Sequence, residues 1–218
     1  EDVIVAKFFE NGVPDWARIL WRTGNTGADC ASHVYSLGAT WGDDFVITGW
    51  TTSASTGAMD VLVARFSSGG VLGWGYAYIL PFGGDDVGTE SVFDGTNIIA
   101  TGWTKVGTNK DFFIIEINPA NGFPTGGWRY DGLGSGDDDG QSIIIASDGN
   151  FVITGTTTSG TPGTNLMLVK IDTAGNYVWG WTVGGPDNDG GFKVIEWQPG
   201  NMLAAAGFTY SWTQNPAD

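Results

Sequence analysis

Asp60-Val-Leu-Val-Ala-Arg65 opens a phrase that the chain repeats. The phrase returns as Asp2-Val-Ile-Val-Ala-Lys7, Asp111-Phe-Phe-Ile-Ile-Glu116 and Asn165-Leu-Met-Leu-Val-Lys170. The four copies begin 58, 51 and 54 residues apart. A period of roughly 40–50 residues that holds several short strands is typical of a β-propeller blade. The spacing therefore predicts an all-β chain with four blades.

The second copy contains four short segments that favour strands. Asp60 to Phe66 ends at the turn Ser67-Ser-Gly-Gly70, and Val71 to Ile79 carries aromatic residues at a period of two. Glu90 to Phe93 and Ile98 to Thr104 follow a loop rich in glycine and aspartate. Four strands in about 50 residues fit one propeller blade.

Further landmarks recur in the other copies. A tryptophan marks the second strand of each copy, and a glycine-threonine phrase closes each one. The tryptophans are Trp16, Trp74, Trp128 and Trp179, and the closing phrases are Gly49-Trp-Thr51, Gly102-Trp-Thr104, Gly155-Thr-Thr157 and Gly207-Phe-Thr209. Landmarks that keep one order in all four copies indicate one repeating structural unit.

These motifs resemble the SBBP-type β-propeller repeat of bacterial and archaeal surface proteins. The resemblance is carried by Val169-Lys-Ile-Asp-Thr-Ala-Gly175, Trp179, Gly184-Gly-Pro-Asp187 and Ile153-Thr-Gly-Thr156, and it covers nearly the whole chain. The first copy departs most, with Asn25-Thr-Gly-Ala-Asp-Cys30 in place of an aspartate pair. The resemblance implies a propeller fold and says little about function.

The resemblance also implies that each sequence repeat is offset from the structural blade. We expect residues 2–22 to supply two outer strands and residues 190–209 the two inner strands of one blade. The prediction is a single domain over residues 1–218, with repeats of about 2–59, 60–110, 111–164 and 165–218. Its four blades of four antiparallel strands form a ring that the N- and C-terminal segments close, which removes two exposed sheet edges. The alternative is an open unit that pairs with another subunit.

Composition limits the partners. The chain of 218 residues has 24 acidic and 9 basic residues, a formal charge of −15. Nucleic acid and anionic membrane surfaces are disfavoured as partners, because binding to phosphate groups requires clustered Lys and Arg and this chain is acidic. Proteins, cations and neutral glycans fit better. No apolar run approaches the roughly 20 residues of a membrane span. Cys30 is the single cysteine, and the sequence begins at Glu1. We therefore expect a secreted or cell-surface prokaryotic protein without an internal disulfide.

Acidic loops are the first candidate site. Carboxylates gather on glycine-bearing turns, and Ca²⁺ prefers several hard oxygen ligands in a flexible geometry. The candidate calcium ligands are Asp85, Asp86, Asp137, Asp138, Asp139, Asp187 and Asp189. The alternative is that Asp and Gly are turn residues whose carboxylates accept hydrogen bonds from nearby backbone N–H groups.

The predicted central channel is the second candidate site. Four different residue types, His33, Glu90, Ser142 and Lys193, fall near equivalent positions of the inner strands. Such an asymmetric set suits a specific ligand. The alternative is that these positions face solvent and that their residue types differ through ordinary sequence drift. Cys30 and His33 lack the partners of a zinc site, and alternation along a strand predicts that they point to opposite faces.

Aromatic side chains are the third candidate. The four repeating tryptophans are expected in the core between blades. Trp50 and Trp103 share a position that is Thr in another copy, so we expect partial exposure and contacts with sugars or a neighbouring subunit. Trp41 and Trp212 lie in a loop and the tail and are further contact candidates.

These patterns favour a non-catalytic surface module that binds proteins or copies of itself. The alternative is a glycan-binding propeller. A glycoside hydrolase is the third reading, because Glu90 and Glu196, with Asp94, could supply the two carboxylates that this reaction needs.

Overall fold

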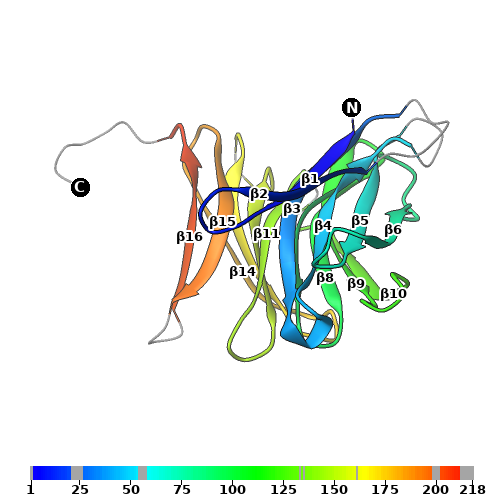
Figure 1. Cartoon of the computed structure of the whole chain (residues 1–218). Coiled ribbons are helices and arrows are strands. Elements are labelled where there is room, and N and C mark those ends of the chain that lie inside the picture. Colours follow the sequence, from blue (N-terminus) through cyan, green and yellow to red (C-terminus); the bar gives the residue numbers. More distant parts are fainter. Residues whose placement is uncertain are drawn as a thin grey trace. The chain divides into compact units, whose positions relative to one another are not determined.

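A computed structural model describes residues 2–20, 27–53, 58–132, 134, 136–160, 162–197 and 202–211. Within these ranges the chain forms sixteen β-strands and one short 3-10 turn, η1 (Ala39–Trp41), and the predicted all-β class is confirmed. Figure 1 shows the strands in chain order. Their bounds are β1 (Val3–Phe8), β2 (Pro14–Leu20), β3 (Asp29–Gly38), β4 (Asp44–Thr51), β5 (Asp60–Phe66), β6 (Leu72–Tyr78), β7 (Asp86–Phe93), β8 (Ile98–Val106), β9 (Asn109–Ile117), β10 (Pro124–Tyr130), β11 (Asp138–Ile145), β12 (Phe151–Thr157), β13 (Asn165–Ile171), β14 (Tyr177–Val183), β15 (Asp189–Trp197) and β16 (Met202–Thr209).

The strands form five antiparallel sheets in which consecutive strands are neighbours. Three sheets have four strands each, in the orders β3-β4-β5-β6, β10-β9-β8-β7 and β11-β12-β13-β14. The other two have two strands each, β1-β2 and β15-β16. The offset between sequence repeat and sheet is therefore as predicted for the three four-stranded sheets. Three of the four predicted four-stranded blades are therefore present as sheets. The strands expected to form the fourth blade lie instead in two separate two-stranded sheets.

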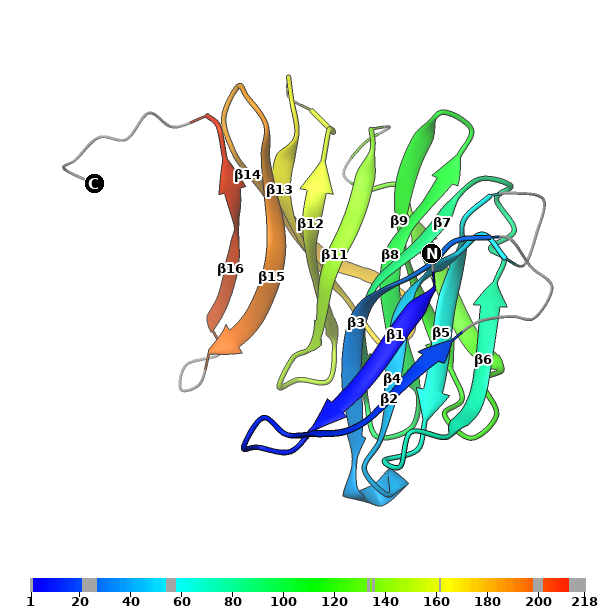
Figure 2. The same ribbon diagram turned by 45° about the horizontal axis from the view of Figure 1, so that its top comes forward.

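The chain divides into two compact units. Glu1–Ala100 with Glu116–Gly126 form the first, and Thr101–Ile115 with Gly127–Asp218 form the second. In the first unit the β1-β2 hairpin lies beside β3 and β4, as Figure 2 shows. Val3 and Val5 of β1 are buried there against Ile47 of β4 and Leu62 of β5. Alternate residues of β1 thus supply the apolar face that joins the hairpin to the four-stranded sheet.

The core of the second unit has the same kind of packing. Val194 of β15 is fully buried and lies against Val152 of β12 and Ala146, with Leu168 and Leu203 packed around them. The β15-β16 hairpin therefore covers the inner part of the β11–β14 sheet. Among the described residues of either unit, no helix is long and apolar enough to cross a membrane.

A close backbone approach explains the glycine in the closing phrases. β3, β11 and β15 each have a bulge, between Ala31 and His33, Gly140 and Ser142, and Gly191 and Lys193. A Cβ on Gly49 would overlap the carbonyl oxygen of Cys30 in the bulged strand, and Gly155 and Gly207 meet Asp139 and Gly190 in the same way. Only glycine fits at these positions, because the side chain of any other residue would overlap the bulge carbonyl.

Each of three tryptophans packs under a turn of the following repeat. Trp16 Nε1 donates a hydrogen bond to the carbonyl of Ser68 at 3.3 Å, and its ring lies against Gly70. Trp74 Nε1 donates to the carbonyl of Pro119 at 3.0 Å, and its ring lies against Gly122. We call each such pair of an indole and a turn glycine a tryptophan clamp.

The third clamp lies in the second unit, where the Trp128 indole is against Gly175. All three turn glycines have positive φ, between 74° and 83°, in the left-handed region that favours glycine. A Cβ on Gly70 would come within 2.7 Å of a carbon of the Trp16 ring. The glycines are therefore required both for the turn and for the approach of the indole.

We predict that Gly70→Ala destabilises the protein by more than Gly149→Ala. Both glycines end the same three-residue turn with positive φ, but a Cβ on Gly149 meets no atom within 4 Å. Left-handed alanine costs about 1–2 kcal/mol at either site, and overpacking against Trp16 adds about 1–3 kcal/mol at Gly70. Urea unfolding of the two variants measures the difference. Equal destabilisation would contradict the role assigned to the clamp.

Candidate functional site

The strand registers place three of the four channel candidates at one position. His33 lies opposite Thr48, Ser142 opposite Thr154 and Lys193 opposite Ala206, each directly after the bulge of its strand. Glu90 lies on β7 and is buried. A bulge changes which side chains of a strand share a face. His33, Ser142 and Lys193 therefore occupy equivalent places in their strands.

His33 and Glu90 come together in the first unit. The Nδ1 atom of His33 accepts a hydrogen bond from the backbone N–H of Ser91 at 3.3 Å, and Nε2 lies 3.4 Å from Glu90 Oε1. Ser91 Oγ in turn accepts a hydrogen bond of 2.7 Å from Thr48 Oγ1. The imidazole thus connects β3 with β7 and belongs to a buried polar network.

Ser142 has the same function in the second unit. Its Oγ accepts a hydrogen bond from the backbone N–H of Val194 at 3.3 Å. Ser91 directly follows Glu90, and Val194 directly follows Lys193. In both units the N–H donor is therefore the residue after a channel candidate. In both units the side chain after a bulge binds a backbone N–H of the next inner strand. This contact satisfies a buried donor that would otherwise be costly.

The bulge in β3 overturns the expectation that Cys30 and His33 point to opposite faces. Cys30 pairs with Trp50 and His33 with Thr48, two residues apart on β4, so both face the same side. Simple alternation fails because the strand holds one extra residue between these pairs. The thiol of Cys30 lies 3.9 Å from the carbonyl of Ala31, and the His33 Nδ1 atom is occupied by Ser91.

The predicted calcium ligands mostly accept hydrogen bonds from loop backbone. Asp86 accepts from the N–H of Leu80 at 2.9 Å, and Asp189 accepts from Gly185 N–H at 2.8 Å and from Ser211 Oγ at 2.7 Å. Asp85 and Asp137 accept from the N–H groups of Met59 and Lys110. Asp187 donates its own N–H to Ser211 Oγ. In the described ranges no group of three or more His, Cys, Asp or Glu side chains is arranged to hold a metal ion.

Asp138 and Asp139 have unusual electrostatics. Asp138 is fully buried opposite Thr157 at the start of β11. Burial raises the pKa of Asp138 to about 7, an effect that the Thr157 hydroxyl opposes and the nearby Asp111 charge reinforces. Burial likewise raises the pKa of Asp139 to about 6, although Lys110 and Gln141 lower it. The equivalent Asp189, hydrogen-bonded to Thr209 and Ser211, has a pKa lowered to about 2.

The carboxylates of the hydrolase reading each have a local partner. Glu196 accepts hydrogen bonds from the N–H and the hydroxyl of Ser147, at 2.7 and 2.8 Å, and so ties β15 to the β11–β12 turn. Asp94 accepts from two N–H groups of its own turn, those of Thr96 and Asn97. Each carboxylate, with Glu90 beside His33, thus stabilises local structure.

The aromatic candidates are placed as follows. Trp41 is half-buried, lies edge-on to Phe93, and has the Arg65 guanidinium 4.6 Å from its ring centroid. Trp50 is half-buried on β4. The ammonium of Lys110 lies 3.8 Å from the ring centroid of Trp103, within the range of a cation–π interaction. Trp212 lies outside the described residues.

Sequence reasoning missed the central role of Arg65. Its guanidinium donates to Asp44, at 2.9 and 2.5 Å, and to the carbonyl of Pro119 at 2.7 Å, while it covers Trp41. The position is occupied by Lys7, Glu116 and Lys170 in the other copies, so the repeat gave no signal of this contact. Arginine alone offers the planar set of donors that this geometry requires.

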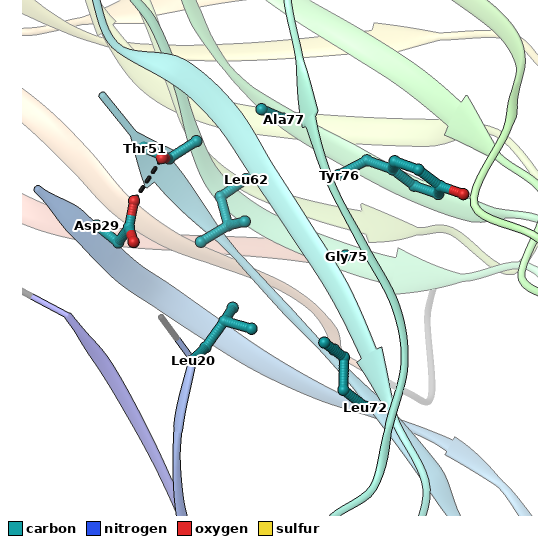
Figure 3. Close-up of a pocket in the computed structure, with 8 residues that line it drawn as sticks. All are labelled: Leu20, Asp29, Thr51, Leu62, Leu72, Gly75, Tyr76 and Ala77. Carbon is teal, nitrogen blue, oxygen red and sulfur yellow. Dashed lines mark hydrogen bonds between the residues drawn. The ribbon is translucent and has the colours of Figure 1, made fainter. Parts of the chain in front are cut away.

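The cavities in the described part of the first unit include two that are lined by residues of several strands. Figure 3 shows the smaller one, about 120 Å³, where Leu20, Leu62 and Leu72 face a hydrogen bond from Thr51 to Asp29. This volume is below the roughly 300 Å³ at which ligand pockets begin. The larger cavity, about 560 Å³, is lined by Trp16 and Phe45 with Lys7, Val34 and Asp43. Of these two cavities, the larger has the size of a ligand site.

Comparison with known proteins adds no family to this geometry. No protein-family model matches the chain, and no curated protein matches it.

We predict that Asp138→Asn stabilises the protein at pH 8 and has little effect near pH 4. The folded-state pKa lies above the unfolded value, so stability is lost as pH rises from about 4 to about 7. The neutral amide avoids this loss. A gain of about 1 kcal/mol would raise Tm by roughly 2–4 °C. Thermal unfolding across this pH range measures it.

Asp148→Asn is the matched control. Asp148 is exposed and its pKa is lowered by its hydrogen bond with Lys170, so the substitution should give no gain at pH 8. A wild-type Tm equal to or above that of Asp138→Asn at pH 8 would contradict the prediction.

Proposed function

We propose that the chain is a non-catalytic four-bladed β-propeller that acts outside the cell or at its surface as a self-associating interaction module. The scaffold part of the proposal is supported by the repeated landmarks and by three four-stranded sheets. In this proposal the two-stranded sheets β1-β2 and β15-β16 would supply the strands of the fourth blade. The resemblance to SBBP-type repeats favours the same architecture and location.

The chemistry of the inner strands supports a scaffold rather than an enzyme. His33 and Ser142 accept backbone hydrogen bonds from the neighbouring inner strand, and Glu196 binds Ser147. Polar side chains that would otherwise be candidates for catalysis thus hold strands together. We interpret His33 and Ser142 as two local solutions to one structural task, the binding of a backbone N–H of the neighbouring inner strand.

An exposed apolar residue at each outer turn carries the interaction proposal. Val13, Val71 and Phe123 each follow the turn glycine directly and are 51%, 67% and 60% exposed. In the last copy Asn176 takes this place and the exposed Tyr177 follows. We call Val13, Val71, Phe123 and Tyr177 the outer rim. Apolar groups repeated at one exposed position fit contacts with an equally repetitive surface, and a second copy of the chain has one.

We predict that solution mass rises above 23.0 kDa with protein concentration. Salt should strengthen association because it screens the repulsion between chains of charge −15. Light scattering of the wild type and of Val71→Ser/Phe123→Ser tests this, and the rim variant should remain monomeric. Ile79→Ser is the control, since Ile79 is equally exposed but lies at the other end of β6.

A monodisperse 23.0 kDa species at all concentrations would overturn the self-association proposal. The same measurement with a calcium chelator tests the aspartate loops. Dissociation on chelation would assign Ca²⁺ to them, and an unchanged mass would leave their carboxylates as turn residues.

Glycan binding is the second proposal, and the larger cavity favours it. Trp16 and Phe45 have ring centroids 5.9 Å apart and stacked planes, beside the charged groups of Lys7 and Asp43. Aromatic faces with a few polar groups suit a sugar ring. Neutral oligosaccharides should then shift the tryptophan emission of the wild type. Val34→Trp should block the shift by filling the cavity, and a titration without change in either protein would reject the proposal.

A further inference from the structure

Asp43 has a backbone conformation that favours glycine. Its φ is 59°, and among the described residues it is the one residue other than glycine with a positive φ. Asp43 stands two residues before Phe45, as Gly149 stands two residues before Phe151, and Gly149 has a φ of 84°. Aspartate tolerates the left-handed region better than most residues but is strained there relative to glycine. The turn itself therefore does not explain the carboxylate at this position.

Asp43 lines the larger cavity of the first unit. Trp16 of β2, Val34 of β3 and Phe45 of β4 supply apolar surface beside it. The cavity volume, about 560 Å³, falls in the range of small-molecule sites. All of the lining residues belong to the first unit, so the cavity is complete within that unit.

The side-chain nitrogen donors that line this cavity are already engaged. Lys7 Nζ lies 3.1 Å from Asp15 Oδ2 and donates a hydrogen bond to the carbonyl of Ser68 at 3.4 Å. Trp16 Nε1 donates to the same carbonyl at 3.3 Å. The ammonium charge of Lys7 is thus compensated by Asp15, and the indole N–H has its acceptor. The cavity therefore offers little to a ligand that carries a negative charge.

The carboxylate of Asp43 has no comparable partner. The adjacent Asp44 accepts hydrogen bonds from the Arg65 guanidinium at 2.9 and 2.5 Å. Within the described part of the chain, the hydrogen bond of Asp43 is made by its backbone N–H, which donates to the carbonyl of Gly38 at 3.1 Å, and its side chain has no ion pair. One uncompensated negative charge thus lines the cavity, and a positively charged donor complements it.

We propose that the larger cavity binds sugars that carry a free amino group, with Asp43 as the acceptor of the ammonium group and the apolar walls against the sugar ring. The inference rests on the glycan-binding function proposed above and names the class of sugar. A hydrogen bond from an ammonium group to a carboxylate is roughly twice as strong as one between neutral groups. A lysine side chain carries the same ammonium group, but one alkyl chain would leave much of a cavity of about 560 Å³ empty.

A pair of ligands with the same sugar backbone tests the role of the charge. The ligands are the disaccharide of glucosamine and the same disaccharide with both amino groups acetylated. Each is titrated against the wild type at physiological ionic strength, where long-range attraction to the acidic chain is screened, and the tryptophan emission is measured. We expect the amino form to bind about tenfold more tightly, the scale by which a charged hydrogen bond exceeds a neutral one.

Variants of Asp43 test the residue itself. Asp43→Asn should remove the preference for the amino form, because the amide keeps the shape of the side chain and loses its charge. Glu10→Gln is the matched control, since Glu10 is exposed in the same unit, does not line the cavity and loses the same charge. Asp43→Gly should also remove the preference while its Tm stays at or above the wild-type value, because glycine adopts a φ of 59° without strain. A loss of binding in this variant is then not caused by unfolding.

The other outcomes overturn the inference in different ways. Equal affinities of the wild type for the two disaccharides, both blocked by Val34→Trp, would reject the amino-sugar preference and leave glycan binding standing. Equal losses in Asp43→Asn and Glu10→Gln would assign the preference to the overall charge of the chain. Butylamine that binds as tightly as the amino disaccharide would assign the site to a lysine side chain instead of a sugar. No response to either disaccharide would reject both this inference and the glycan-binding function.

Discussion

The packing of an indole under a left-handed turn is the contact on which the repeat depends. Each of the three clamps needs a tryptophan on one outer strand and a glycine in the next repeat, because any Cβ at that glycine would enter the ring. The indole N–H also binds a turn carbonyl in two of the clamps, at Ser68 and Pro119. A single contact therefore fixes both the distance between neighbouring repeats and the conformation of the turn. Such nearest-neighbour contacts are what stabilise repeat proteins.

The bulges have a comparable role on the inner strands. A bulge turns the following side chain, His33 or Ser142, so that it accepts a backbone N–H from the next inner strand. The closing-phrase glycine exists because the bulge carbonyl approaches it. Variation at the bulge positions therefore has a structural explanation, since imidazole and hydroxyl groups can both accept the same kind of donor. Lys193 is different in kind, because an ammonium group only donates.

The sequence predicted strand content, hairpin order and the offset between repeat and sheet, because these follow from periodicity and turn residues that lie close together in the chain. It did not predict the bulge in β3, since an extra residue changes pairing without changing composition, and the argument that Cys30 and His33 face apart failed for this reason. It also did not predict Arg65, whose contacts with Asp44, Pro119 and Trp41 join segments far apart in the chain. The raised pKa of Asp138 depends on burial, whereas Asp189 at the equivalent position is stabilised by hydroxyl and N–H donors.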